Sequence, residues 1–315
     1  MSPKLTADAR GVYVIAATPF QDDGRIDDAS IDSLVEFYVR CGCHGMTILG
    51  VMGEFQKLSE SETMAVAKRF ITAARGRMPV IVGVTNPGTS QLVKLASGAM
   101  EAGAAGVMAM PISGLKTDEA VTAYMTGMLK ALGPSIPVCV QDYPQLSGVY
   151  FSAGCFVALV DAFPQIVMFK HEDAPGLRKL SEIRRKLDGR AHRRVSIMCG
   201  NGGIHLPQEY RRGADGAMTG FAFPDMLVAM HNLFAAGQAD AAEDLYDLYL
   251  PLLRHEFQPG IGLAIRKEIL RRRGAIGSAA VRAPGPKLDA DDVAELDLFL
   301  ARLATKTGKA ITTIG

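Results

Sequence analysis

Eight short apolar runs, separated by longer amphipathic stretches, constrain the fold of this chain more than any other feature of its sequence. The runs are four or five residues long and nearly all apolar, which is typical of strands buried on both faces of a parallel sheet. We expect strands at Tyr13–Ala16, Met46–Leu49, Val80–Gly83, Gly106–Ala109, Pro137–Val140, Ile166–Lys170, Ser196–Cys199 and Gly216–Thr219.

The stretches between these runs have the apolar spacing of amphipathic helices. We expect helices at Asp27–Cys41, Ser59–Ala74, Ser90–Ala102, Thr117–Leu132, Ser152–Ala162 and Pro175–Leu187. A strand–helix unit repeated about eight times predicts an α/β fold of the (β/α)8 barrel type. The alternative, an open doubly wound sheet, would need fewer strands or a second domain.

The pattern changes after the eighth run, where helix follows helix. The expected helices are Pro224–Ala236, Asp240–His255, Gly260–Arg273 and Asp289–Ala304. We therefore expect a barrel core over residues 1–225 and a C-terminal helical extension over 226–315 that packs on it. One of these added helices should complete the barrel.

Charge and composition exclude several classes of partner. The net charge is +1 in 315 residues, so electrostatics gives no reason to expect nucleic acid or a membrane surface as a partner. We interpret the two basic runs, 184–194 and 266–273, as solvated helix faces. No run approaches the roughly 20 apolar residues of a membrane span, and no secretory signal is visible. Five scattered cysteines, without zinc-ligand spacing, are typical of reduced thiols. We expect a cytoplasmic protein without a metal site.

A lysine ends the sixth run, in the stretch "QIVMFKHED" from Gln165 to Asp173. Strand alternation places Lys170 and Glu172 on one face, toward the mouth of the barrel, and His171 on the other. Burial there should lower the pKa of Lys170, and a neutral amine can form a Schiff base with a carbonyl while Glu172 moves protons. A Lys–Glu ion pair that closes the barrel is an equally good interpretation of these residues alone.

Polar and glycine-rich segments follow three other strands at the same end of the barrel, where barrel enzymes place their active sites. Backbone amides in "GVMGE" can hold a carboxylate, especially around Met52 and Gly53, although a tight turn explains the glycines as well. "GNGG" can bind hydroxyls or a phosphate. The predicted substrate-binding residues are Val51, Met52, Gly53, Glu54, Gln141, Asn201 and Gly202.

Taken in order, these segments resemble the dihydrodipicolinate synthase/N-acetylneuraminate lyase family of class I aldolases. The resemblance runs from "GVYVIAATPFQDDGRID" through "GVMGE", "MFKHED" and "GNGG" to "VRAPGPKL", roughly residues 11 to 305. It implies a (β/α)8 barrel, usually a homotetramer, and it implies that Lys170 forms a Schiff base with the keto group of a small 2-keto acid. No metal or diffusible cofactor is implied.

The chain departs from the family pattern where the usual proton relay stands. Val51 and Met52 replace two hydroxyl residues, and Gln141 stands three residues before Pro144, where a tyrosine is usual. By alternation, the neighbouring Tyr143 should face away from the site. An arginine that the synthases carry after this proline, for their second substrate, is not found. Because the relay is missing while the lysine is kept, the resemblance argues against dihydrodipicolinate synthesis and sialic acid cleavage.

The chain keeps the lysine, has a glutamate two residues later and lacks the relay tyrosine. This pattern resembles the sugar-acid dehydratase branch of the family, which includes the L-2-keto-3-deoxyarabonate dehydratases. We expect a hydro-lyase that forms 2,5-dioxopentanoate and water, with Lys170 as nucleophile and Glu172 as proton carrier. The alternative within this scaffold is an aldolase that releases pyruvate. A catalytically inactive barrel that acts as a sensor is the alternative from a different class, and a pyridoxal phosphate enzyme is a remote one.

Overall fold

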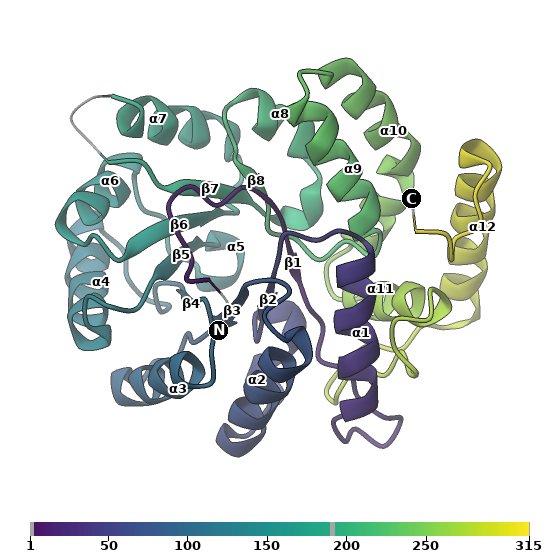
Figure 1. Ribbon diagram of the computed structural model, residues 1–315, viewed down its shortest axis with the longest axis horizontal. Helices are drawn as coiled ribbons and strands as arrows, with labels where there is room; N and C mark the ends of the chain where they lie inside the picture. Colours follow the sequence, from purple (N-terminus) through teal and green to yellow (C-terminus); the bar gives the residue numbers. More distant parts are fainter. Residues whose placement is uncertain (1–2, 190–192, 315) are drawn as a thin grey trace.

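The computed structural model describes residues 3–189 and 193–314, and its strands form a closed barrel. Each strand pairs in parallel with the next, and β8 pairs with β1 (Figure 1). The predicted (β/α)8 barrel is confirmed. The strands are β1 (Gly11–Ile15), β2 (Gly45–Ile48), β3 (Val80–Gly83), β4 (Gly106–Ala109), β5 (Val138–Asp142), β6 (Ile166–His171), β7 (Ser196–Cys199) and β8 (Gly216–Ala217).

Helices surround the barrel in sequence order, as Figure 1 shows. Ser59 and Glu62 form a capping box at the start of α2, because each side chain accepts a hydrogen bond from the backbone N–H of the other. The surrounding helices are α1 (Asp28–Arg40), α2 (Glu60–Ala74), α3 (Thr89–Glu101), α4 (Asp118–Leu132), α6 (Ala153–Ala162), α7 (Leu177–Leu187), α8 (Leu206–Arg211) and α9 (Pro224–Ala235).

Four short helical turns lie in the loops that leave the C-terminal ends of the strands. These turns are η1 (Val51–Gly53) and η2 (Phe55–Lys57) after β2, α5 (Pro144–Ser147) after β5, and η3 (Asn201–Gly203) after β7. They stand at the mouth of the barrel, the end at which this architecture gathers its functional groups.

Three further helices follow the barrel: α10 (Ala239–Glu256), α11 (Gly262–Arg272) and α12 (Ala290–Thr307). α9 packs on β1 and completes the ring, while α10 packs on α9, α11 and α12. Figure 1 places this group to one side of the barrel, with α12 at its edge. The predicted boundary between residues 225 and 226 therefore falls inside α9.

Two separate apolar clusters fix the direction of the strand side chains. One fills the interior of the barrel and is rich in methionine; the other lies between the barrel and the helices. Along β6, Met168 belongs to the interior cluster and Phe169 to the helix layer. Lys170 accordingly points inward again, just above the methionine layer.

Candidate active site

Lys170 and Glu172 meet at the mouth of the barrel. Only 5% of Lys170 and 7% of Glu172 is exposed, and Lys170 Nζ lies 3.0 Å from Glu172 Oε2. The intervening His171 points to the helix layer as expected, where it stacks on Phe169. Its Nε2 lies 3.0 Å from the carbonyl oxygen of Gly176. Both interpretations of Lys170, as a member of an ion pair and as a nucleophile, are consistent with its contact with Glu172.

Two neighbours, Gln141 and Asn201, donate hydrogen bonds to Glu172. Gln141, which pairs in register with Lys170, donates from Nε2 to Oε2 at 2.7 Å. The backbone N–H of Asn201 donates to Oε1 at 3.4 Å, and the side-chain amide of Asn201 donates to the Glu172 carbonyl at 2.9 Å. A Cβ at Gly200 would stand 2.4 Å from Oε1, so only glycine leaves room for this carboxylate.

A cavity of about 650 Å³ opens above this cluster. Its walls come from the loops after β2, β5, β7 and β8 and from the segment that joins α10 to α11. It brings together these predicted site residues: Val51, Met52, Gln141, Lys170, Glu172, Asn201 and Gly202. The cavity therefore collects most of the groups that the sequence placed in one site.

Gly53 and Glu54 do not line this cavity, contrary to their predicted contact with substrate. Glu54 has a φ of +54°, and its carboxylate accepts hydrogen bonds from Lys267 at 2.6 Å and Lys57 at 2.8 Å. The backbone N–H of Arg282 donates to it as well, at 3.0 Å. The N–H of Gly53 is also engaged, because it donates to the carbonyl of Gly50 at 2.9 Å. Both residues stabilise the loop rather than face the cavity.

Tyr143 lines the cavity, and the expectation that it faces away is wrong. β5 ends at Asp142 and α5 begins at Pro144, so strand alternation no longer applies at this position. Burial and the nearby Glu172 carboxylate raise the pKa of Tyr143, and the Arg266 guanidinium opposes that rise. The proline at the next position was the signal that the strand had ended.

Arg266 also lines the cavity, although nothing near it in the sequence indicated a role in the site. The interpretation of the run 266–273 as a solvated face is wrong for Arg266, Lys267 and Arg273, which are all buried. Each of these cations has a buried carboxylate partner, which offsets the cost of its burial. In the run 184–194, Arg184 is likewise buried against Asp215, and residues 190–192 lie outside the described part of the chain.

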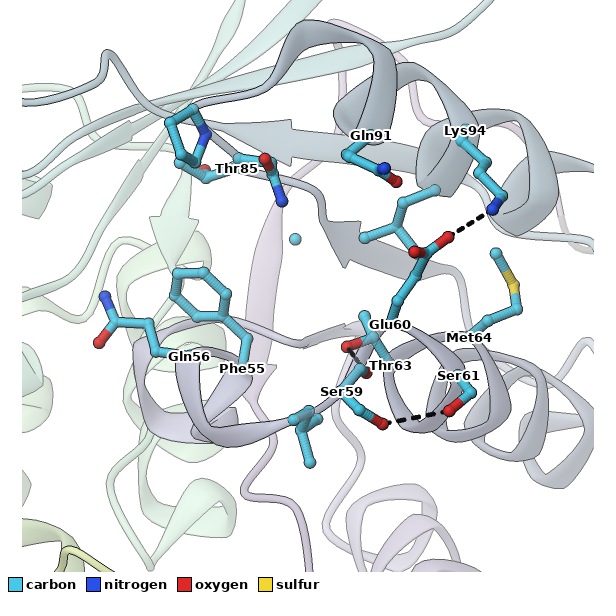
Figure 2. Close-up of a pocket in the computed structure, with 15 residues that line it drawn as sticks. Phe55, Gln56, Ser59, Glu60, Ser61, Thr63, Met64, Thr85, Gln91 and Lys94 are labelled. Carbon is cyan, nitrogen blue, oxygen red and sulfur yellow. Dashed lines mark hydrogen bonds and ion pairs between the residues drawn. The ribbon is translucent and has the colours of Figure 1, made fainter.

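A larger cavity of about 1020 Å³ lies between α2 and α3 (Figure 2). Polar groups in its lining bond to one another. Lys94 Nζ pairs with Glu60 Oε1 at 2.5 Å, and the hydroxyl oxygens of Ser59 and Ser61 lie 3.1 Å apart. Lys94 and Glu60 are largely exposed, so their charges are screened by water. None of the clustered residues around Lys170 reaches this cavity, and we assign it no chemistry.

Residues 3–189 and 193–314 contain neither a candidate metal centre nor a candidate membrane-spanning helix. Within these ranges, no group of three or more His, Cys, Asp or Glu side chains is arranged to hold a metal ion. No helix in the same ranges combines the length and apolar character that crossing a bilayer requires.

The chain matches a known protein family along nearly its whole length. Residues 8–302 match the model of the dihydrodipicolinate synthetase family. The chain belongs to this family. It is 32% identical to an L-2-keto-3-deoxyarabonate dehydratase of Azospirillum brasilense, over 96% of this chain and 97% of that protein. It is 31% identical to a 4-hydroxy-tetrahydrodipicolinate synthase of Sorangium cellulosum, over 87% of this chain and 89% of that one.

A solved structure of the family agrees with the barrel described above. The dihydrodipicolinate synthase of Rhodopseudomonas palustris is 48% identical, has a TM-score of 0.93 and covers 96% of this chain and all of its own. The predicted family is confirmed, and with it the broader prediction of a lyase. The relatives carry different activities in their names, so family membership alone leaves the reaction to be argued from the site.

Proposed function

We propose that this lyase is a Schiff-base dehydratase that converts a 2-keto-3-deoxy sugar acid, with L-2-keto-3-deoxyarabonate as the expected substrate, to 2,5-dioxopentanoate and water. The contact of 3.0 Å between Lys170 Nζ and Glu172 Oε2 carries the proposal. It places a buried carboxylate beside the nitrogen that would form the imine. The identity of 32% to a dehydratase along nearly the whole chain gives independent support.

The first step is condensation at Lys170. Glu172 accepts a proton from the ammonium, the free amine attacks the C2 ketone, and loss of water leaves a protonated imine. The positive nitrogen then withdraws electrons from C2, so a proton at C3 becomes acidic. Lys170 thus serves as the electron sink, and the proposed steps require no metal or diffusible cofactor.

Glu172 then carries the proton that elimination requires. It removes a proton from C3 to give an enamine, and the enamine expels the C4 hydroxyl, which leaves as water with the same proton. Loss of a proton from C5 and protonation at C3 leave an enol between C4 and C5. Transfer of the C5 hydroxyl proton to C4 then converts this enol into the aldehyde. Hydrolysis of the imine consumes one water and frees Lys170. One water is released overall, and no carbon–carbon bond breaks.

Gln141 and Asn201 support this reaction by positioning Glu172. The sequence suggested that both bind substrate hydroxyls, but their side-chain amides donate to Glu172. Gln141 Nε2 donates to carboxylate oxygen Oε2, and the backbone N–H of Asn201 donates to Oε1. The carboxylate therefore keeps a fixed direction toward the imine carbon and its neighbour. Such a fixed geometry is what proton transfer needs.

Product analysis on a panel of 2-keto-3-deoxy pentonates and hexonates tests the proposal. We expect 2,5-dioxopentanoate from the pentonate of matching stereochemistry. Release of pyruvate instead would establish the aldolase alternative. Borohydride reduction in the presence of a 2-keto acid should add the mass of the ligand at Lys170, and the absence of any adduct would point to a catalytically inactive barrel.

Glu172→Gln separates imine formation from proton transfer. The variant should still be trapped by borohydride, because Lys170 is intact, but turnover should fall by roughly 100-fold or more, the usual contribution of a general acid–base. Turnover equal to that of the wild type would assign the proton transfer to another group.

We also retain two expectations from the sequence, a cytoplasmic location and a homotetramer, and sedimentation of the purified protein would test the second.

A further inference from the structure

Arg266 lines the cavity and carries a hydrogen-bond donor that no described residue engages. Only 4% of this residue is exposed, and its Nε donates to Glu256 Oε1. The other oxygen of Glu256 accepts the N–H of Ala222 at 3.1 Å, so the carboxylate fixes the guanidinium against the segment after β8. Arg266 Nη1 is buried and has no hydrogen-bond partner among the described residues. A buried cationic donor left without an acceptor is costly, which indicates a ligand.

The free nitrogen lies beside the loop that follows β2. A Cβ added to Gly220 would stand 2.7 Å from Arg266 Nη1 and 2.8 Å from Met52 Sδ. The guanidinium and the Met52 side chain therefore flank the same point of the wall, and the missing side chain at Gly220 lets them approach. All three residues line the cavity.

Two backbone donors stand in the same loop. The N–H groups of Gly53 and Glu54 donate to the carbonyls of Gly50 and Val51. Within the described part of the chain, no acceptor engages the N–H groups of Val51 and Met52, which open the short helix η1. Because β2 and β6 stand on opposite sides of an eight-stranded barrel, this loop lies across the mouth from Lys170, and both line the same cavity.

We propose that Arg266 Nη1 adds a charged hydrogen bond to the carboxylate of the 2-keto acid whose ketone reacts with Lys170, beside the loop after β2 whose backbone amides the sequence already indicated for this carboxylate. The proposal rests on the proposed function for its substrate class. Val51 and Met52 offer no side-chain hydroxyl to a carboxylate, and Arg266 supplies a charged donor in their place. Glu256 positions the guanidinium by its Nε edge and leaves the Nη1 edge for the ligand.

Trapping with two small ketones tests this assignment. Pyruvate carries the carboxylate, whereas hydroxyacetone has a neutral CH2OH group in its place, and borohydride reduction reports imine formation with either. The test variant is the double substitution Glu256→Gln/Arg266→Gln, which removes both charges and leaves an amide pair instead of a lone buried carboxylate. Arg271→Gln is the control, because this exposed arginine of the same helix pairs with Glu268 at the surface.

The half-saturating concentration of pyruvate should rise roughly 10- to 100-fold in the double variant, as expected for the loss of a charged hydrogen bond. That of hydroxyacetone should stay unchanged, and Arg271→Gln should resemble the wild type with both ketones. Arg266→Lys should recover part of the preference for pyruvate, since it restores a positive charge.

Two outcomes would overturn the assignment. Equal losses for both ketones, with a lower melting temperature, would give Arg266 a structural role only. Unchanged trapping of pyruvate, with weaker binding of the hydroxylated substrate alone, would place Arg266 at the other end of the ligand. The carboxylate assignment and the proposed dehydration are tested separately. Trapping of pyruvate reports only imine formation, which comes before both elimination and aldol cleavage.

Discussion

At the scale of single residues, the Glu172 carboxylate depends on a residue that has no side chain. Gly200→Ala would bring a methyl group to within 2.4 Å of Glu172 Oε1 and 2.5 Å of its Cγ, so the carboxylate must move. We expect kcat to fall roughly 100-fold while borohydride trapping at Lys170 persists. Steady-state kinetics and trapping on the same preparation measure the two effects.

Gly127→Ala is the matched control for Gly200→Ala. A Cβ at Gly127, within α4, meets no heavy atom within 4 Å. This substitution should raise the free energy of unfolding by about 0.5–1 kcal/mol and leave kcat unchanged. If Gly200→Ala behaved in the same way, the positioning of Glu172 would not limit the reaction.

Glu209 gives the protein a pH-dependent stability that is independent of catalysis. Burial raises its pKa to about 7, with His171 opposing the rise, whereas the unfolded chain has the ordinary value of 4.5. The folded state therefore keeps a proton that the unfolded state loses, so stability falls as pH rises from 4.5 to 7, by up to roughly 3 kcal/mol. Glu209→Gln removes this penalty.

Urea unfolding of Glu209→Gln and wild type at pH 5 and pH 8 measures the difference. The variant should gain stability relative to the wild type at pH 8 and gain little at pH 5. A difference that stays the same at the two pH values would contradict the assigned titration.

The positions of Lys170, Glu172 and Gln141 at the mouth of the barrel could be predicted because strand geometry dictates where alternate side chains point. The directions of Glu54 and Tyr143 could not, because both residues lie beyond the strand ends, where each φ angle decides the direction of the chain. Arg266 had no local signal at all, since its place in the site depends on how α11 packs against the barrel.

At the scale of elements, the loop after β2 is tied to α11 by a buried ion pair. Lys267 is fully buried and donates to Glu54 at 2.6 Å and to the carbonyls of Thr18 and Ala280 at 2.9 and 2.8 Å. Glu54→Gln should cost about 3–5 kcal/mol of unfolding free energy, because it leaves the buried Lys267 ammonium without a carboxylate partner. Lys267→Met should cost less, because Lys57 still pairs with the Glu54 carboxylate. The double variant should lose at least about 1 kcal/mol less than the sum.

The exposed pair Lys94 and Glu60 provides the control for that cycle. Its coupling energy, from Glu60→Gln and Lys94→Met, should not exceed about 0.5 kcal/mol. Urea unfolding of both cycles supplies the comparison. Additive losses at Glu54 and Lys267 would mean that α11 and the loop are not coupled through this pair.

At the scale of the whole molecule, the barrel and the C-terminal helices are joined by buried polar contacts. Arg273, which follows α11, binds Asp225 of α9 at 2.8 and 3.0 Å, and Glu256 of α10 accepts the N–H of Ala222. We expect the segments 1–225 and 226–315 to unfold together, because residues of both segments share one apolar cluster that separation would expose to water.

Thiol labelling can test this cooperativity, since all five cysteines are buried and precede residue 225. Labelling during a denaturant titration reports on the barrel, and far-UV circular dichroism reports on all helices. The two curves should coincide. A helical loss that precedes thiol exposure would show that the extension is a separate folding unit.

The order of strands and helices in this molecule could be predicted because each strand is an apolar run and each helix has an amphipathic period. Three predicted strands, at Val80–Gly83, Gly106–Ala109 and Ser196–Cys199, match the observed bounds. The short α8 was missed, because its six residues are too few to display a helical period. The packing of α10–α12 depends on tertiary contacts that no local pattern encodes.

The methionine layer beneath the site has a consequence for the movement of protons. Met108, Met168, Met198 and Met218 are almost fully buried inside the barrel, below Lys170. A thioether does not donate a proton and accepts hydrogen bonds only weakly, so this layer offers no path from the lysine to the far end of the barrel. We therefore expect Lys170 to exchange protons with solvent through the mouth, which the proposed sugar acid would occupy when bound.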